Sequence, residues 1–281
     1  MSTLGVCVIT DSTCDLPAAV CDRLGVIVVP IAVEIDGDQH ADRVDLSSPD
    51  AIETLARAST AQPSIDAFVN VLRQAATDHA SAVVITHSAK LGGTFESAQA
   101  AAAVLAPAFP VTVVDSGSVT MGLGFAVMRA AEMAQAGASA EEIAAEVGDQ
   151  RGRTEVAFFV ETLEYLERGG RIGRAAALIG GALQLKPMLR IDEGQIVPFD
   201  RSRTRARAID DLAQFVADLG IIERVAVLHS STPREAEEFA ARLRRETVLP
   251  NDRVMVTRIG PAVVTHIGPG AMGVAVVDLP G

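Results

Sequence analysis

Short apolar runs alternate with longer amphipathic stretches along the first half of the chain. The apolar runs have the length and β-branching of buried strands, and they cover residues 6–10, 26–35, 83–86 and 111–114. The stretches between them carry helix start and stop signals. Ser139 and Glu142, for example, match the capping-box pattern. This alternation predicts a parallel sheet covered by helices on both faces.

The second half of the chain has a different pattern. Glu193-Gly194 is a two-residue turn signal between two apolar runs, which predicts an antiparallel hairpin. Helices are expected over residues 163–168, 172–185, 204–219 and 233–247, and further strands over residues 156–160, 225–228, 254–257 and 274–277. Antiparallel strands mixed with helices predict an α+β arrangement. We therefore expect a parallel-sheet α/β/α domain over residues 1–153 and a mixed-sheet α+β domain over residues 154–281.

Three loops of the first half follow predicted strands directly, at residues 11–15, 86–94 and 115–120. All three are rich in Ser, Thr, Gly and Asp. Open α/β sheets bind their ligands at the carboxyl ends of the strands. We therefore expect these loops to converge on one site.

The charge of the chain narrows the class of partner. The formal net charge is −12, and residues 1–150 carry −13 while residues 151–281 carry +1. A chain without a broad basic face is a poor nucleic-acid binder, because phosphate contacts need clustered cations. A local run of Arg201, Arg203, Arg205 and Arg207 is the exception. It is either the solvated start of a helix or a docking surface for an acidic protein partner.

Nucleotide and catalytic motifs are absent or lack their required context. Residues 268–273 match G-x-G-x-x-G, but only eight residues follow Gly273 and they predict a strand. A dinucleotide site needs a helix there and an acidic residue further on, so this interpretation is excluded. The chain contains no G-x-x-x-x-G-K-[ST], H-E-x-x-H or G-x-S-x-G. The sequence therefore predicts no nucleotide site of its own.

The cysteines and the termini bear on the cellular compartment. Cys7, Cys14 and Cys21 have no metal-ligand spacing and predict free thiols in a reducing environment. The N-terminus lacks a basic leader with an apolar stretch, and the longest uncharged run, residues 97–114, contains two prolines. We expect a cytoplasmic protein without a bound metal or an integral membrane segment.

Several segments match one family pattern, in order along the chain. They are Ile9–Pro17 (I-T-D-S-T-C-D-L-P), Thr60–Ser64 (T-A-Q-P-S), Ser88–Thr94 (S-A-K-L-G-G-T), Arg168–Gly173 (R-G-G-R-I-G), Lys186-Pro187, Arg203–Arg205 (R-T-R) and His266–Gly270 (H-I-G-P-G). Together they resemble the DegV family of fatty-acid-binding proteins, the carrier subunits of bacterial fatty acid kinase.

The resemblance implies a function as well as a fold. In that family two α/β domains enclose a fatty acid whose carboxylate lies at the domain junction. A separate ATP-binding kinase phosphorylates the bound acid to an acyl phosphate, for use in phospholipid metabolism. The missing nucleotide motif agrees with this division of labour. The resemblance thus implies a ligand-binding carrier that needs no cofactor and is not an enzyme alone.

The resemblance also implies a head-group site. It places donors for the carboxylate at Thr60 and at the position of Gly92, where the family has serine. Gly92 offers only its backbone N–H, so the contact should depend on water, Thr94 or Ser88, or the head group should differ. Thr60 could instead cap the helix expected after Ser64.

Three further residues are candidates for the head group. His266 could donate to the carboxylate and later stabilise a phosphate, or it could be an ordinary loop histidine. Arg171 lies between glycines, where it could meet an anion or remain solvated. Ser12 is a weaker candidate, because D-S-T can form an Asx turn.

The acyl chain needs an apolar tunnel. The small and apolar residues of the expected helix over residues 172–185 are candidates for it, namely Ala176, Leu178, Ile179 and Leu183. A helix that only packs in the core would have the same composition. Two rival functions also remain: a hydrolase or phosphotransferase that uses loop Ser/Thr residues and His266, or a carrier of another apolar ligand.

Overall fold

The computed structural model describes residues 5–46, 52–55, 57–106, 108–178, 185–247 and 249–279. In the first half, four parallel strands form a sheet in the order β2-β1-β6-β7. Their bounds are β1 Val6–Asp11, β2 Ile27–Val29, β6 Ser81–Thr86 and β7 Val111–Asp115. The parallel sheet predicted from the alternation of strands and helices is confirmed.

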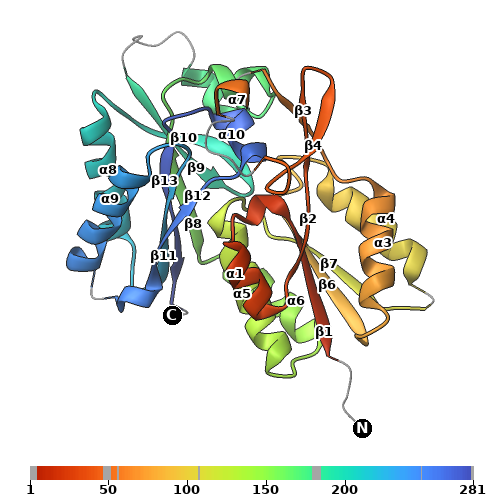
Figure 1. Cartoon of the computed structure of the whole chain (residues 1–281). Helices are drawn as coiled ribbons and strands as arrows, with labels where there is room; N and C mark the ends of the chain where they lie inside the picture. The colour runs from red at the N-terminus through yellow and green to blue at the C-terminus, as the bar shows by residue number, and fades with distance from the viewer. Residues whose placement is uncertain are drawn as a thin grey trace.

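Helices cover both faces of this sheet (Figure 1). They are α1 Ala18–Leu24, α3 Ile65–Ala75, α4 Thr94–Leu105, α5 Met121–Gln135 and α6 Ala140–Arg151. Successive side chains of a strand point to opposite faces. In β1, Cys7 and Ile9 accordingly pack with α3 and α4, while Val8 packs in the larger core that contains α5. Both faces of the strand are buried, which explains its unbroken apolar run.

The second half forms a six-stranded mixed sheet in the order β10-β9-β8-β13-β11-β12. The strands are β8 Thr154–Phe159, β9 Lys186–Asp192, β10 Gln195–Ser202, β11 Ile222–His229, β12 Val254–Arg258 and β13 Met272–Asp278. The predicted hairpin is confirmed, because β9 and β10 pair antiparallel around Glu193 and Gly194, whose φ angles are 46° and 78°. The polypeptide passes from one sheet to the other between α6 and β8.

The two sheets stand side by side with α5 between them (Figure 1). One apolar core joins residues of α5, both sheets and the short helix α10 Pro261–Ile267. Helices α8 Arg205–Asp218 and α9 Pro233–Glu246 cover the outer face of the mixed sheet. The remaining short elements are η1 Ser12–Cys14, α2 Ile52–Leu55, α7 Glu164–Arg168, η3 Gly173–Leu178 and η4 Asn251–Arg253.

Two local predictions are wrong. The run over residues 26–35 is two strands, because Pro30 cannot continue a ladder; its second part, β3 Ala32–Ile35, belongs to a separate antiparallel sheet with β4 Asp38–Ala41 and β5 Ser59–Ala61. The expected helix over residues 172–185 is a 3₁₀ helix where it is described, at Gly173–Leu178. His266, for which an ordinary loop histidine was the alternative to a ligand role, lies in the short helix α10.

Candidate functional site

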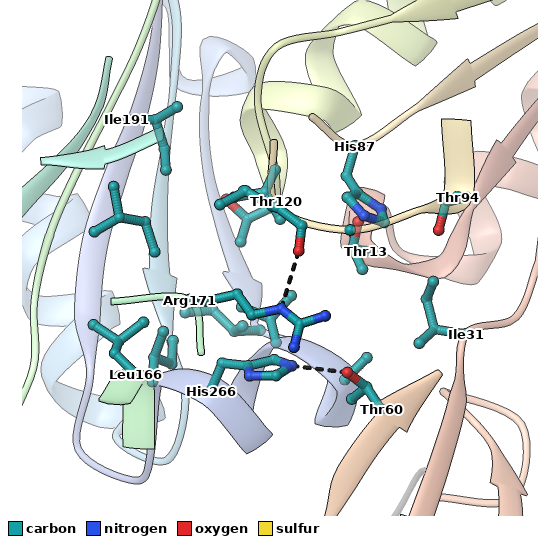
Figure 2. A pocket seen from close by; sticks show the side chains of 18 of the residues that line it. Thr13, Ile31, Thr60, His87, Thr94, Thr120, Leu166, Arg171, Ile191 and His266 are labelled. Carbon is teal, nitrogen blue, oxygen red and sulfur yellow. Dashed lines mark hydrogen bonds between the residues drawn. The ribbon is translucent and has the colours of Figure 1, made fainter. Parts of the chain in front are cut away.

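A cavity lies between the two halves of the chain, and residues of both halves line it. All three strand-end loops reach it. Thr13 follows β1, His87 and Thr94 follow β6, and Thr120 follows β7 (Figure 2). The expected convergence of these loops on one site is confirmed.

Hydrogen bonds hold the three loops together. The backbone N–H of His87 donates to Asp11 Oδ2 over 2.8 Å. Ser88 N donates to Ser118 O over 2.8 Å, and Ala89 N donates to Asp115 Oδ1 over 3.2 Å. Each bond joins neighbouring strand ends, so the three loops form one hydrogen-bonded floor of the cavity.

The cavity also has an apolar wall, to which both halves of the chain contribute. It is built from Ile31, Val119, Val156, Phe158, Leu166, Ile191, Ile196, Leu228, Ile259, Ala262, Val263 and Ile267. Val156 and Phe158 are alternate residues of β8, so one face of the mixed sheet supplies part of this wall. The cavity therefore combines a polar end with an apolar interior.

Thr60 and His266 meet at the polar end. Thr60 Oγ1 lies 2.8 Å from His266 Nε2 (Figure 2). Helix α10 is held across the junction by the buried carboxyl groups of two aspartates of the first half. Asp15 Oδ1 accepts from Gly260 N over 2.8 Å, and Asp42 Oδ1 accepts from Ala262 N over 3.1 Å. These bonds satisfy N–H groups at the start of α10 and fix the place of His266.

The His266 imidazole is neutral at physiological pH. Burial and the nearby Arg171, Arg168 and His87 lower its pKa to about 4. Its Nδ1 has no partner among the described residues and faces Gly169, where an added Cβ would lie 2.1 Å away. A proton on Nδ1 would be a buried, unpaired N–H, which folded proteins avoid. We therefore assign the proton to Nε2, which donates to Thr60 and leaves the threonine hydroxyl free to donate to a ligand.

Arg171 spans the junction between the halves. Its Nε donates to Leu91 O over 3.1 Å, and its Nη1 donates to Gly169 O over 2.6 Å. The other terminal nitrogen, Nη2, makes no hydrogen bond to the described residues. The half-buried guanidinium lines the cavity. It can therefore offer charge and N–H donors to an anion.

The N-terminus of α4 opens on the same space. Gly92, Gly93 and Thr94 all line the cavity. The first N–H groups of a helix lack partners within it and favour a negative charge. Thr94 is fully buried, and its hydroxyl has no hydrogen-bond partner in the described part of the chain. This helix start therefore adds donors to the cavity that Thr60 and Arg171 also line.

Asp11 and His87 form a buried pair that the sequence patterns did not reveal. His87 Nδ1 lies 3.1 Å from Asp11 Oδ2, and Thr13 donates to Asp11 Oδ1 through both its backbone N–H and its hydroxyl. Burial opposes the Asp11 charge, but His87 and these donors outweigh it and hold the pKa of Asp11 below its usual value. Burial likewise opposes the His87 charge, yet Asp11 raises the pKa of His87 above its usual value of about 6.5.

Five of the six residues expected at the head group line the cavity: Thr60, Gly92, Thr94, Arg171 and His266. Ser12 does not, because its hydroxyl donates to Asp42 Oδ2 over 2.6 Å and accepts from Ile31 N over 3.0 Å. Ser88, considered as a substitute for the family serine, donates to Gly194 O over 2.8 Å instead. Their hydroxyls maintain the loop structure.

Of the four residues expected around the acyl chain, the structure describes two, and neither lines the cavity. Ala176 is exposed, and Leu178 is half-buried against the core without lining the cavity. Ile179 and Leu183 lie outside the described residues. The described apolar wall comes from strands of the mixed sheet, from α10 and α7, and from the loop residues Ile31, Val119 and Ile259.

The four arginines belong to different elements. Arg201 lies near the end of β10, Arg203 follows that strand, and Arg205 and Arg207 lie in the first turn of α8. Arg205 is held inside the protein by Glu235, Glu161, Thr232 and the carbonyl of Gly270. Arg207 pairs with Asp211 over 2.9 Å, whereas Arg201 and Arg203 are exposed.

The residues that the structure describes contain no group of three or more His, Cys, Asp or Glu side chains arranged to hold a metal ion. No helix among them has the length and apolar character needed to cross a bilayer.

Comparison with known proteins gives a consistent set of relatives. A family model described as "Uncharacterised protein, DegV family" matches residues 5–279. A DegV domain-containing protein of Streptomyces coelicolor is 37% identical over 277 residues, which cover 96% of this chain and 98% of the relative. A structure described as fatty acid binding of a DegV family protein from Thermus thermophilus has a TM-score of 0.87 and 35% identity, covering 98% of this chain and 100% of that one.

A second solved structure agrees with the first. DegV of Bacillus subtilis, described as a fatty acid binding protein, matches with a TM-score of 0.86 and 28% identity, covering 99% of this chain and 100% of that one. The similarity extends over both halves of the chain, so it includes all the elements that surround the cavity.

Proposed function

This chain belongs to the DegV family, and from that premise we propose that it binds a long-chain fatty acid in the cavity between its two sheets. The carboxylate lies at the polar end, against Thr60, Arg171 and the start of α4. The acyl chain extends along the apolar wall. Relatives described as fatty acid binding share the fold over nearly their whole length, which supports this assignment.

The observation that carries the proposal is the union of two environments in one cavity. Burial of an acyl chain contributes about 0.8 kcal/mol per CH₂ group. The apolar wall of the cavity, which includes Val156 and Ile267, supplies the surface that buries it. A carboxylate removed from water needs hydrogen-bond donors to offset its desolvation. The Thr60 hydroxyl and Arg171 Nη2 are such donors, and they face the same space. A molecule with one anionic end and a long apolar body matches this arrangement.

We propose that the protein is a cytoplasmic carrier that presents the carboxylate to a separate ATP-dependent kinase, which forms the acyl phosphate. The lack of a nucleotide motif in the sequence supports a partner as the source of ATP. The exposed Arg201 and Arg203 are the residues we assign to docking. Arg205 contributes structurally, because its donors are already used.

Mass spectrometry of an organic extract tests the ligand assignment. Native protein purified from lipid-replete cells should release close to one equivalent of a long-chain fatty acid. An extract that contains another apolar acid, or none, would contradict the assignment. Turnover of acyl or phosphoryl esters by the purified protein alone would instead indicate a hydrolase or phosphotransferase.

A further inference from the structure

His87 is held so that only one of its ring nitrogens faces the cavity. Its Nδ1 is bonded to Asp11 Oδ2 at 3.1 Å. A carboxylate only accepts hydrogen bonds, so this nitrogen must carry a proton. The other nitrogen, Nε2, is on the cavity side, close to Gly92, and Figure 2 shows the ring extending into the space toward Thr13 and Arg171.

The fixed proton on Nδ1 has a consequence for an anionic ligand. In the neutral ring, Nε2 presents a lone pair, which cannot bond to a carboxylate. In the imidazolium, Nε2 carries a proton and donates. A carboxylate at this end of the cavity therefore makes a favourable contact with His87 only when the ring carries a second proton, on Nε2.

Gly92 leaves the room that the ring occupies. A Cβ added to Gly92 would lie 2.8 Å from His87 Nε2, a distance that side chains do not tolerate without a shift. Serine at this position would also direct its hydroxyl into the same region. Gly92 and His87 are therefore sterically coupled, and the imidazole occupies space next to the helix start where a serine side chain would otherwise lie.

We propose that His87, positioned by Asp11, is a ligand-contacting residue whose protonated Nε2 donates to the fatty acid carboxylate, and that Gly92 is required because it leaves space for the ring. This inference rests on the proposed function, and it adds a specific residue and a proton to it. Asp11 is a positioning residue, since it does not line the cavity itself.

The charged groups around His87 favour this role. Asp11 on β1 and Asp115 at the end of β7 stabilise the imidazolium, while Arg171 opposes it. His266 on α10 is neutral, because its pKa is about 4. The balance keeps the pKa of His87 above its usual value. Binding of a carboxylate next to Nε2 adds a negative charge and raises this pKa further.

The first experiment measures the affinity for oleate by titration calorimetry between pH 6 and pH 9. Below the pKa of His87 the ring is already protonated; above it, each complex must take up a proton, so affinity should fall by up to about tenfold per pH unit. Because a proton is taken up from the buffer, the measured binding enthalpy should depend on the ionisation enthalpy of the buffer. His87→Gln should weaken oleate binding about tenfold or more at pH 7 and abolish the pH dependence of the affinity. Thr60→Val should also weaken binding, but its affinity should retain the wild-type pH dependence.

A pH dependence that is equal in the wild type and in His87→Gln would overturn the inference. Absence of oleate binding by the wild-type protein would instead overturn the proposed function. Thermal melting of each variant shows whether it is folded. Asp11 keeps its bonds from the backbone N–H of residue 87 and from Thr13 in a His87 variant, so the fold should survive.

The second experiment uses the steric coupling and a different residue. Gly92→Ser should reduce oleate affinity about tenfold, because the ring must leave its position. The double variant His87→Ala with Gly92→Ser should bind better than Gly92→Ser alone, since the ring is gone and the serine hydroxyl can donate. Gly92→Ser with wild-type affinity, or a double variant whose loss is the sum of the two single losses, would overturn the coupling.

Discussion

Thr60 Oγ1 and His266 Nε2 lie 2.8 Å apart although 206 residues separate them in the chain. The bond joins the small β3-β4-β5 sheet of the first half to α10 of the second half. Because the neutral ring donates to Thr60, the threonine hydroxyl remains available to a ligand carboxylate. The bond thus joins the two halves of the chain at the polar end of the cavity.

Removal of the Thr60 hydroxyl should weaken fatty acid binding. Thr60→Val keeps the shape of the side chain but removes the donor, and the expected loss of affinity is about fivefold to a hundredfold. Oleate binding can be measured by titration calorimetry. Thr77→Val is the matched control, since Thr77 is exposed and bonds only to its own helix. Equal affinities of Thr60→Val and the wild type would remove Thr60 from the site.

A side chain at position 169 should disturb His266. In Gly169→Ala the new Cβ would lie 2.1 Å from His266 Nδ1, so the ring must leave its place beside Thr60. Oleate affinity should fall at least as much as in Thr60→Val. The control is Gly148→Ala in α6, where a Cβ meets nothing within 4 Å. Gly169→Ala with unchanged affinity would show that the His266 position is not needed for binding.

A large side chain in the apolar part of the cavity should weaken the binding of long fatty acids more than the binding of short ones. Val263 lines the cavity, and Val263→Trp would occupy space that a long acyl chain needs. We expect a larger loss of affinity for oleate than for octanoate. Val104→Trp, at an exposed position in α4, is the control. Equal losses for both acids would place the acyl chain elsewhere.

Asp15 should make the protein less stable as the pH rises. Burial raises its folded-state pKa to about 8, despite Arg43 nearby, while its unfolded value is about 3.9. Between these values the folded state holds more protons than the unfolded state, so stability falls as pH rises from about 4 to 8. Asp15→Asn keeps an acceptor for Gly260 N and removes the titration. The difference in free energy of unfolding between Asp15→Asn and the wild type should therefore shift in favour of the variant by at least about 1 kcal/mol between pH 5 and pH 8. Urea unfolding at the two pH values measures this difference. A constant difference would contradict this.

Reversal of the exposed arginines should separate binding from kinase coupling. Arg201→Glu with Arg203→Glu should leave oleate affinity unchanged and reduce acyl phosphate formation when the partner kinase and ATP are supplied. Arg205→Ala serves as the contrast: it breaks bonds to Glu161 and Glu235 and should lower the melting temperature. Loss of oleate binding in a folded Arg201/Arg203 variant would contradict the assignment of these residues to docking.

The local features of the fold were predictable from the sequence. Ser139 and Glu142 form the expected capping box, and Glu193-Gly194 forms the expected turn, because each depends on residues close in the chain. The convergence of the strand-end loops was also predictable, since parallel topology alone brings the carboxyl ends of strands together.

The composition of the site was only partly predictable. The Asp11–His87 pair joins residues 76 positions apart, and no spacing rule identifies it. The apolar wall was expected in residues 172–185, where composition suggested it, but alternate residues of β8 form part of the observed wall. Such residues differ from any other buried strand positions only in the tertiary arrangement, which places a cavity beside them.

A crystal structure of the protein loaded with oleate tests the central claim most directly. We predict one oleate in the cavity, its carboxylate within hydrogen-bond distance of the Thr60 hydroxyl and its acyl chain against Val156, Phe158 and the other apolar wall residues. Oleate bound outside this cavity, or bound with its carboxylate at the apolar wall and its methyl end at Thr60, would contradict the claim.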